Sequence, residues 1–380
     1  MTKIMNAVRW TYNQAVEYVT DEKTLGKRSI KHVRAWCVTK EALDNKEVPW
    51  AESIPFDIRD EGARDVIKAV AAMYAKNKAR RARGESKQEY KLKCRKKRDQ
   101  QTMTIHSKHW VHKSGFLADL LGHRGAKLRH PRREPLPDTM QYDSRIVRTP
   151  LGEYYLCVPM EGRVWDENQV PDAATQSVAS LDPGVRTFMT IYSADGGVTD
   201  WAAGDTTRIF RLCSQWDMLQ SKCRHPMTTH RRRYKMRRAA RRIQKRIRSL
   251  VDECHRKLAK WLCTNFRVVL IPLFETQQMV RRGHRRLNSK GAKAMCTWSH
   301  YRFRQHLKHV AGSTSWCKVV ETTEEFTSKT CGECGRLHQK LGGAKNFKCP
   351  SCDYEADRDA NGARNILLRY LTVNGVKSQC

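Results

Sequence analysis

Four cysteines in the C-terminal part of the chain constrain its fold more than any other feature. They form two Cys-x-x-Cys pairs with fourteen residues between the pairs, at Cys331, Cys334, Cys349 and Cys352. Two such pairs can converge on one tetrahedral ion, because each pair presents two thiolates from a single turn. We predict a zinc ribbon with one structural Zn²⁺, which supplies folding energy to a segment too small to bury a core of its own.

An acidic motif follows the last cysteine. Asp357 and Asp359 lie in the stretch Asp-Arg-Asp-Ala-Asn-Gly-Ala, which leads into a run that is apolar and typical of a helix. Carboxylates at the start of a helix commonly cap its unpaired N–H groups and interact favourably with its dipole. Taken alone, the motif therefore predicts helix capping, and it suggests a metal site only if a second acidic position meets it.

Such a second position lies far upstream, at the end of a predicted buried strand. The apolar residues from Val178 onward lead to Asp182, which is followed by Pro183 and Gly184. An Asp-Pro-Gly sequence often forms a turn, and this is one interpretation of Asp182. The other is that a cation binds there, since a carboxylate is costly to bury without one.

The charge of the chain indicates the class of its partner. Its 380 residues include 73 Lys and Arg against 39 Asp and Glu, a formal net charge of +34. Residues 76–98 and residues 224–248 each contain twelve Lys or Arg. Side chains at this density repel one another unless a polyanion neutralises them, so we expect a nucleic acid partner. No apolar run approaches the ~20 residues that span a bilayer, and we expect no membrane partner.

The other ten of the 14 cysteines show no pairing pattern. This scatter is typical of reduced thiols rather than of a disulfide framework. The N-terminal segment also lacks the apolar centre of a secretory signal. We expect an intracellular, soluble protein.

Apolar periodicity predicts the order of the elements. Helical spacing in residues 6–20 and 63–75 predicts a helical N-terminal region. Alternating residues around position 103 and a hairpin over residues 145–159 predict a small β module. From residue 178 onward, two strands, one or two long helices over 216–264, two further strands and a last helix predict an α/β domain, with the ribbon inserted ahead of that helix.

Within this α/β domain, distant carboxylates can meet at the carboxyl edge of one sheet. They would be Asp182, a glutamate from another strand end, and either Asp357 or Asp359. Three carboxylates at one point repel one another unless cations bind them. With two Mg²⁺ ions about 4 Å apart they can form a clamp for in-line phosphodiester hydrolysis.

The motifs together resemble a known family. LDPGVRTF, a long basic helix, TSKTCxxCG, CPxC and DRDANGARNIL are similar to the RuvC-like (RNase H-like) nuclease half of the TnpB family of RNA-guided transposon nucleases, which are related to type V CRISPR effectors. The closest resemblance is to their eukaryotic and viral relatives, the Fanzor proteins. Upstream, WTYNQAV, PFDIRDEGARDVIKA and RIVRTPLGEYYLCV resemble the family's recognition and wedge regions, so the resemblance extends over nearly the whole chain.

This resemblance implies a division of the chain into six parts. They are a helical recognition region at 1–100, a β-barrel wedge module at 101–165, a linker at 166–177, a RuvC-like nuclease domain at 178–326, a zinc ribbon that contacts target nucleic acid at 327–355, and the last nuclease helix with a tail at 356–380.

The resemblance also implies the catalytic residues, with one departure. The family has a glutamate inside an apolar strand, where this chain has Leu270-Ile271-Pro272, and Pro272 cannot bind a metal. In Fanzor-like proteins a relocated glutamate before the TSKTC motif takes this role, and Glu324 matches it. We expect Asp182, Glu324 and Asp359 to hold two Mg²⁺ ions, with Glu275 and Asp357 as second choices.

As a member of this family, the chain is expected to be an RNA-guided DNA endonuclease. It would bind a guide (omega) RNA as a monomeric ribonucleoprotein, recognise double-stranded target DNA beside a short adjacent motif, and cleave it. In a eukaryotic cell we expect it in the nucleus.

Two other functions fit part of the sequence. A nucleic-acid-binding protein that keeps the fold but has weak or no catalytic activity is compatible with the loss of a carboxylate at Pro272. A zinc-ribbon transcription or RNA-processing factor accounts for the charge and the cysteines, but it gives no role to Asp182 or Asp359.

Overall fold

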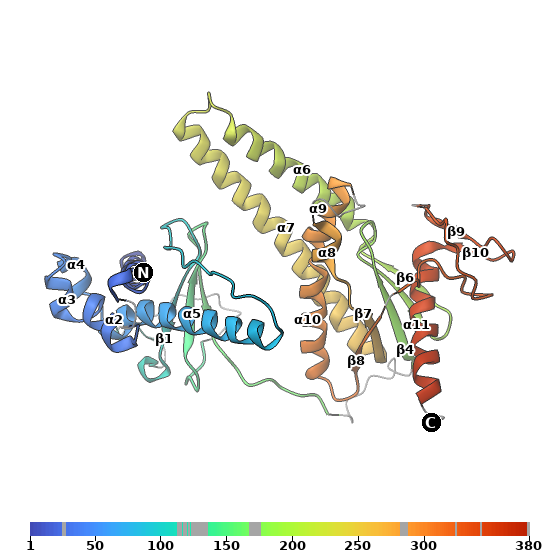
Figure 1. The fold of residues 1–380 in the computed structure, drawn as a ribbon, viewed down its shortest axis with the longest axis horizontal. Helices are drawn as coiled ribbons and strands as arrows, with labels where there is room; N and C mark the ends of the chain where they lie inside the picture. Colours follow the sequence, from blue (N-terminus) through green and yellow to red (C-terminus); the bar gives the residue numbers. More distant parts are fainter. Residues whose placement is uncertain are drawn as a thin grey trace. The chain divides into compact units, whose positions relative to one another are not determined.

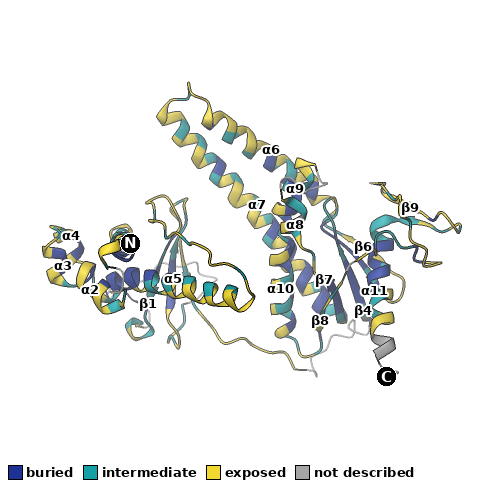
Figure 2. Cartoon of the chain, in the orientation of Figure 1, coloured by how far each residue is buried: buried dark blue, intermediate teal, exposed yellow. Residues whose placement is uncertain are grey.

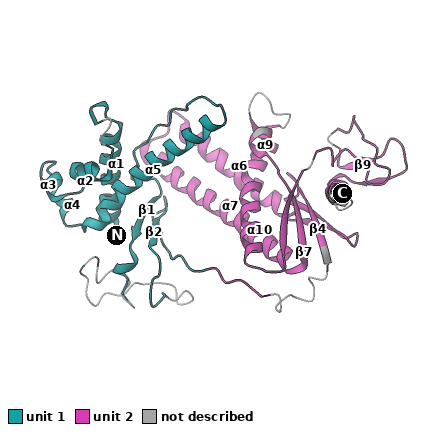
Figure 3. Ribbon diagram, turned by 60° about the horizontal axis from the view of Figure 1, so that its bottom comes forward, with its two compact units in different colours: residues 1–161 teal, residues 162–380 magenta. Residues whose placement is uncertain are grey.

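A computed structural model describes residues 1–24, 28–111, 116, 120, 122, 136–166, 176–281, 288–323, 325–342 and 344–377 (Figure 1). The chain divides into two compact units, residues 1–161 and residues 162–380 (Figure 3). The finer division into six parts stays a prediction. Among the described helices, none combines the length and the apolar character needed to cross a bilayer.

Unit 1 begins with a helical layer. Helix α1 (Thr2–Thr20) packs along α5 (Phe56–Ala82), and shorter elements complete the layer: η1 (Glu22–Thr24), α2 (Ile30–Cys37), α3 (Lys40–Asp44) and α4 (Pro49–Glu52). The predicted apolar stripe of α1 is buried in this contact. Gly62 allows the two helices to approach, because a Cβ there would lie 2.6 Å from the carbonyl oxygen of Val8.

The rest of unit 1 is a small antiparallel sheet. Its strands are β1 (Gln101–Ile105), β2 (Ser144–Arg148) and β3 (Tyr154–Cys157), in the order β1-β2-β3, with η2 (Ser107–His109) after β1. The predicted hairpin is confirmed, since β2 and β3 pair antiparallel from Arg145 with Cys157 to Arg148 with Tyr154. Gly152 in its turn has a φ of +89°, which favours glycine.

Unit 2 is built on a five-stranded mixed sheet with the order β6-β5-β4-β7-β8. The strands are β4 (Gln176–Pro183), β5 (Met189–Ser193), β6 (Val198–Trp201), β7 (Phe266–Pro272) and β8 (Lys318–Thr322). Strands β4, β7 and β8 are parallel, so their carboxyl ends lie at one edge of the sheet. The predicted α/β domain is confirmed. Strand β6 was not predicted.

Helices cover both faces of this sheet. On one face, α7 (His230–Asn265) and α10 (His300–Gly312) bury an apolar core with β4, β5 and β7. On the other face, α11 (Arg358–Lys377) buries Ile366 and Leu367 against Leu270. Alternate side chains of β4 and β7 thus point to opposite faces of the sheet and are buried on both, as expected for central strands covered by helices. The short helices α8 (Thr276–Val280) and α9 (Ser289–Trp298) join β7 to α10.

The predicted long helical stretch is a pair of helices. Helix α6 (Asp205–Arg224) begins eleven residues before the predicted start at 216, and a turn that contains Pro226 separates it from α7. Most of the buried residues of α7 lie in its C-terminal half, among them Val251, Leu258 and Leu262. The far ends of α6 and α7 project from the sheet and are exposed (Figure 2).

Two buried histidines lie under the turn between β4 and β5. Phe188 stacks between His255 and His300, with ring centroids 5.0 Å away on each side. His255 Nε2 lies 2.9 Å from the carbonyl oxygen of Trp298. Burial lowers the pKa of His255 to about 4 and the pKa of His300 to about 3, because the apolar core disfavours the charged imidazolium. Both rings are neutral at pH 7.

Acid will therefore destabilise unit 2 before the carboxylates titrate. Below pH 6.5 the unfolded chain binds protons that the folded histidines do not bind, so stability present above that pH is lost as the pH falls toward 4. Between pH 7 and pH 5 we expect a loss on the order of 2 kcal/mol per histidine, measured by urea denaturation. In His300→Phe this loss should shrink, whereas exposed His225→Gln should match the unsubstituted protein. Equal pH dependence in all three proteins would contradict this account.

Candidate functional site

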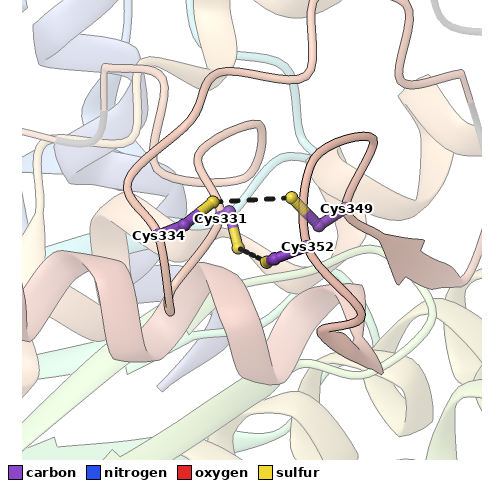
Figure 4. Close-up of side chains that lie close together, drawn as sticks. All are labelled: Cys331, Cys334, Cys349 and Cys352. Carbon is purple, nitrogen blue, oxygen red and sulfur yellow. Dashed lines mark hydrogen bonds between the residues drawn. The ribbon is translucent and has the colours of Figure 1, made fainter.

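The four ribbon cysteines converge on one point. The Sγ atoms of Cys331 and Cys352 are 3.7 Å apart, those of Cys334 and Cys349 are 3.6 Å apart, and all four lie within 4.8 Å of one another (Figure 4). Four sulfurs arranged tetrahedrally ~2.3 Å from a zinc ion would be ~3.8 Å apart, whereas a disulfide is ~2.05 Å long. The predicted convergence is confirmed, and the donor set fits a metal such as zinc.

Local backbone chemistry forms the two turns of the ribbon. In the first, the N–H of Gly335 donates to the carbonyl oxygen of Cys331 at 3.1 Å, and Gly335 has a φ of +74°. In the second, the N–H of Ser351 lies 3.4 Å from Cys349 Sγ. A two-stranded hairpin of β9 (Asn346–Lys348) and β10 (Glu355–Asp357) buries Phe347 beside the cysteines.

The hydrogen bonds of the next residues distinguish the two candidate aspartates. Asp357 Oδ1 accepts the N–H of Asp359 at 2.9 Å and the N–H of Ala360 at 3.3 Å. Asp357 therefore caps α11 in the way that the sequence alone predicted for this motif. It also lies 3.5 Å from the ammonium of Lys345. Capping uses the carboxylate of Asp357, which favours Asp359 as the residue available for a metal.

Two asparagines of the same motif join α11 to the ribbon. Asn361 Nδ2 donates to the carbonyl oxygen of Thr330 at 2.8 Å, and Asn361 Oδ1 accepts the N–H of Gly332 at 3.0 Å. Asn365 Nδ2 donates to the carbonyl oxygens of Thr327 and Thr330, at 2.8 and 2.7 Å. Both amides are buried, so these hydrogen bonds are sheltered from water. The first cysteine turn and the start of α11 thus form one structural piece.

Asp182 lies on the face of the sheet that α11 covers. A Cβ on Gly362 would lie 2.6 Å from Asp182 Oδ2, so the carboxylate approaches α11 closely at this glycine and would have to shift for a larger residue. A hydrogen bond also joins β4 to α11, since Ser180 Oγ donates to the carbonyl oxygen of Ala363 at 2.7 Å. Asp359 precedes Gly362 by three residues, which places both on one face of α11. The structure therefore brings Asp182 next to the helical turn that carries Asp359.

A further carboxylate lies in the same row of the sheet. Thr190 of β5 pairs with Asp182 of β4 on one side and with Asp200 of β6 on the other. Its hydroxyl donates to Asp200 Oδ1 at 2.8 Å. Sequence reasoning missed Asp200 because β6 is short and exposed, and only the pairing of β5 with β6 reveals that Asp200 shares a face with Asp182.

Asp359 lies in surroundings that disfavour negative charge. Its partial burial raises the pKa of the carboxyl above the usual value, and the charges of Asp357 and Asp200 raise it further against the opposing effects of Arg358 and Lys345. A bound cation would reverse the effect by stabilising the ionised form. Perturbed carboxylates of this kind are common at metal and catalytic sites.

The site is also predicted to include a glutamate. β4 and β7 pair through Ser180 and Leu270, so Pro272 is the β7 residue at the level of Asp182. Glu275 is exposed in the segment between β7 and α8. Glu324 lies outside the described residues. Its neighbours are described, and Arg369 of α11 contacts both: Nε donates to Thr323 Oγ1 at 2.8 Å, and Nη2 lies 3.1 Å from Glu325 Oε2.

The structure thus brings Asp182 and Asp359 to one region of unit 2 and assigns Asp357 to capping. Within the ranges that the structure describes, the four cysteines are the one group of three or more His, Cys, Asp or Glu side chains close enough to share an ion.

The two basic stretches have different conformations. Residues 76–82 end α5, whereas residues 85–96 follow as a segment without regular secondary structure, held by two side-chain amides. Asn77 pairs with the backbone N–H and C=O of Gln88, both at 3.1 Å, and Asn13 pairs with those of Arg95, at 2.7 and 3.1 Å. Residues 224–248 include the end of α6 and the exposed half of α7. Both stretches present mostly exposed cations, which suits a phosphate backbone.

Comparison with known proteins identifies relatives of this chain. The family model described as "Cas12f1-like, TNB domain" matches residues 300–366. A putative transposase of Paramecium bursaria Chlorella virus 1 is 29% identical over 380 residues, which cover 98% of this chain and 83% of that protein. A TnpB-like protein of Acanthamoeba polyphaga mimivirus is 28% identical over 237 residues, 60% of this chain and 42% of its own length. These matches support a TnpB/Fanzor-type protein.

Cas12f1 proteins resemble this chain in sequence and in fold. The CRISPR-associated endodeoxyribonuclease Cas12f1 of Sulfoacidibacillus thermotolerans is 35% identical over 80 residues, 20% of this chain and 18% of that protein. A cryo-EM structure of a Cas12f1-sgRNA-target DNA complex superimposes with a TM-score of 0.50 at 14% identity, covering 96% of this chain and 81% of that one. The latter likeness shows a shared fold.

We expect one zinc ion per chain, released when a ribbon cysteine is replaced. Cys349→Ser should lower the zinc content from one ion toward zero, because three thiolates and a hydroxyl bind Zn²⁺ far more weakly than four thiolates. The measurement is elemental analysis of the purified protein, combined with limited proteolysis between residues 336 and 348. Exposed Cys94→Ser is the matched control and should keep its zinc. Loss of zinc from the control as well, or a zinc-free unsubstituted protein, would refute the assignment.

Proposed function

We propose that this protein is an RNA-guided DNA endonuclease of the Fanzor kind, with a RuvC-like site formed by Asp182 and Asp359. The observation that carries the proposal is the contact between the end of β4 and α11, where Gly362 leaves room for the Asp182 carboxylate beside the turn that holds Asp359. The family supports the class of activity, since a relative is an endodeoxyribonuclease. The shared fold with Cas12f1 supports the same class.

The residues of the site suit magnesium. Asp182 and Asp359 offer carboxylate oxygens, which Mg²⁺ prefers, and we propose Glu324 as the third carboxylate, with Glu275 as the second choice. Bound there, two Mg²⁺ ions would supply an activated water and stabilise the leaving oxygen of the phosphodiester. Other residues of the chain would hold these carboxylates in place. Gly362 leaves space for the Asp182 carboxylate, and Asp357 caps the first turn of α11. Arg369 hydrogen-bonds Thr323 and Glu325, the neighbours of Glu324.

Guide RNA and double-stranded target DNA are the proposed partners. The superimposed Cas12f1 complex contains an sgRNA and a target DNA, and the exposed cations of residues 76–98 and 224–248 provide a matching charge in this chain. Base pairing would carry sequence specificity, while these cations hold backbones and unit 1 reads a short adjacent motif. We further propose a monomeric ribonucleoprotein that works in the nucleus of a eukaryotic host.

One observation favours a second candidate function. Pro272 stands in β7 at the level of Asp182, and among the described residues no three carboxylates lie close enough to share an ion. A site with two carboxylates holds two metal ions weakly. The alternative is a protein that binds guide and target nucleic acids in the same way but cleaves slowly or not at all.

Substitutions of the aspartates separate the two functions. With guide RNA and Mg²⁺ present, Asp182→Ala and Asp359→Asn should each lower the cleavage rate at least about a hundredfold, equivalent to ~2.7 kcal/mol, because each removes a metal ligand. The rate is measured on end-labelled target DNA in single turnover, and RNA affinity is measured in parallel and should stay unchanged.

Asp357→Asn is the matched control, since asparagine also caps helices and the cleavage rate should stay within a few fold of the unsubstituted protein. If Asp182→Ala cleaves as fast as the unsubstituted protein, the residue has no part in the reaction. If no variant and no unsubstituted protein cleaves with guide present, the binding-only function is correct.

A further inference from the structure

The segment between β8 and the ribbon contains an aromatic residue in a strained conformation. Phe326 has a φ of +63°, in the left-handed region that a bulky side chain rarely occupies. Its side chain is also 63% exposed, so packing within the protein offsets little of this cost. Glycine or asparagine would adopt the same backbone more easily. Folding alone therefore does not explain an aromatic residue at this position.

Contacts on both sides hold Phe326 in this conformation. Arg369 binds the residues before it, through Thr323 Oγ1 and Glu325 Oε2, and Asn365 Nδ2 donates to the carbonyl oxygen of Thr327 immediately after it. The carbonyl oxygen of Phe326 itself accepts the N–H groups of Lys329 at 2.9 Å and Thr330 at 3.0 Å. Strain of this kind persists where the surrounding structure over-determines the backbone, and it is often associated with function.

The same contacts place Phe326 beside the proposed metal site. A Cβ on Gly362 would lie 2.6 Å from Asp182 Oδ2 and 3.8 Å from Ser328 Oγ, so the Ser328 hydroxyl and the Asp182 carboxylate flank one point of α11. Phe326 is two residues from Ser328, a backbone separation of at most about 7 Å. The backbone of Phe326 therefore lies close to the segment that flanks Asp182.

The chemistry of this surface matches an unpaired nucleobase. Aromatic side chains bind single strands by stacking on bases of any sequence, since every base has a π face. The formal charge of +34 favours a polyanion over an apolar peptide on the surface of this chain. A strand that lies across Asp182 and Asp359 for cleavage would bring its bases near the ring of Phe326.

We propose that Phe326 stacks on an unpaired base of the DNA strand that is presented to Asp182 and Asp359, and so positions that strand. The inference rests on the proposed function for the identity of the strand. The stack itself is a binding contact, and it can be measured without cleavage.

The test uses the full chain with its guide RNA, in an Asp182→Ala background that retains the strand. The probes are 12-nucleotide single-stranded DNAs that match the guide or extend past it, each with 2-aminopurine at a different position. Stacking on Phe326 should quench the 2-aminopurine fluorescence at one position or at two adjacent positions. Phe326→Gly and Phe326→Asn should abolish that quenching and weaken binding by about fivefold or more, whereas Phe326→Tyr should preserve both.

Stability provides a second readout that a purely structural role would not produce. Phe326→Gly should raise the melting temperature of the protein by about 2–4 °C, because glycine relieves the left-handed strain even though DNA binding weakens. Tyr301→Ala on α10 is the matched control, since Tyr301 is also exposed, at 60%, and it lies on an unstrained helix. It should change neither quenching nor affinity.

Several results would overturn the inference. Unchanged quenching and affinity in Phe326→Gly and Phe326→Asn would show that the ring contacts no base, and so would an equal loss in Phe326→Tyr. A lower melting temperature in both Phe326→Gly and Phe326→Asn would show that the ring stabilises the fold. These outcomes are distinct from failure of the proposed function, because a protein that never cleaves DNA can still show the stack, and one that cleaves normally can lack it.

Discussion

The seating of α11 on the sheet is the contact on which the rest of unit 2 depends. This helix buries Ile366 and Leu367 against β7, accepts a hydrogen bond from Ser180 of β4, and receives the ribbon through Asn361 and Asn365. One element therefore positions three segments that are distant in the chain: the end of β4, the first cysteine turn, and Thr323 with Glu325. A shift of α11 would move all of them together.

The electrostatics of the region oppose the charges that the chemistry needs. Asp182 and Asp200 lie on one face of the sheet in a protein whose overall charge is strongly positive, and the pKa of Asp359 is raised by burial and by the charges of Asp357 and Asp200. A nucleic acid strand would add phosphates to the same place. Cations bound between the carboxylates and the phosphates would resolve this repulsion, so substrate binding and metal binding should support each other.

The parts of this architecture that local chemistry determines were predictable from the sequence. The spacing of the cysteines predicted their convergence, and alternating residues predicted the β2-β3 hairpin. The start of α11 was predicted as well, and its cap, which the sequence left open between two roles for Asp357, is decided by two hydrogen bonds. Each of these features depends on residues within about 20 positions of one another.

Features that depend on distant pairing were not predictable. The position of Asp200 beside Thr190 requires the β5-β6 register, and the close approach of Asp182 to Gly362 appears only when α11 packs on β4. The conformation of the segment after α5 depends on amide contacts from Asn13 and Asn77, which no periodicity indicates. The roles of Asp182, Glu324 and Asp359 remain predictions that rest on the family resemblance and, for the two aspartates, on this geometry.

The most direct test of the central claim, that α11 brings two distant aspartates to one cation, is anomalous diffraction from crystals of the protein grown with Mn²⁺. Manganese prefers the same carboxylate and water ligands as magnesium. The account predicts an anomalous peak at coordination distance, ~2.2 Å, from a carboxylate oxygen of Asp182 and from one of Asp359. A peak bound by one of these residues alone, or no peak between β4 and α11 when the zinc peak at the cysteines is clear, would contradict it.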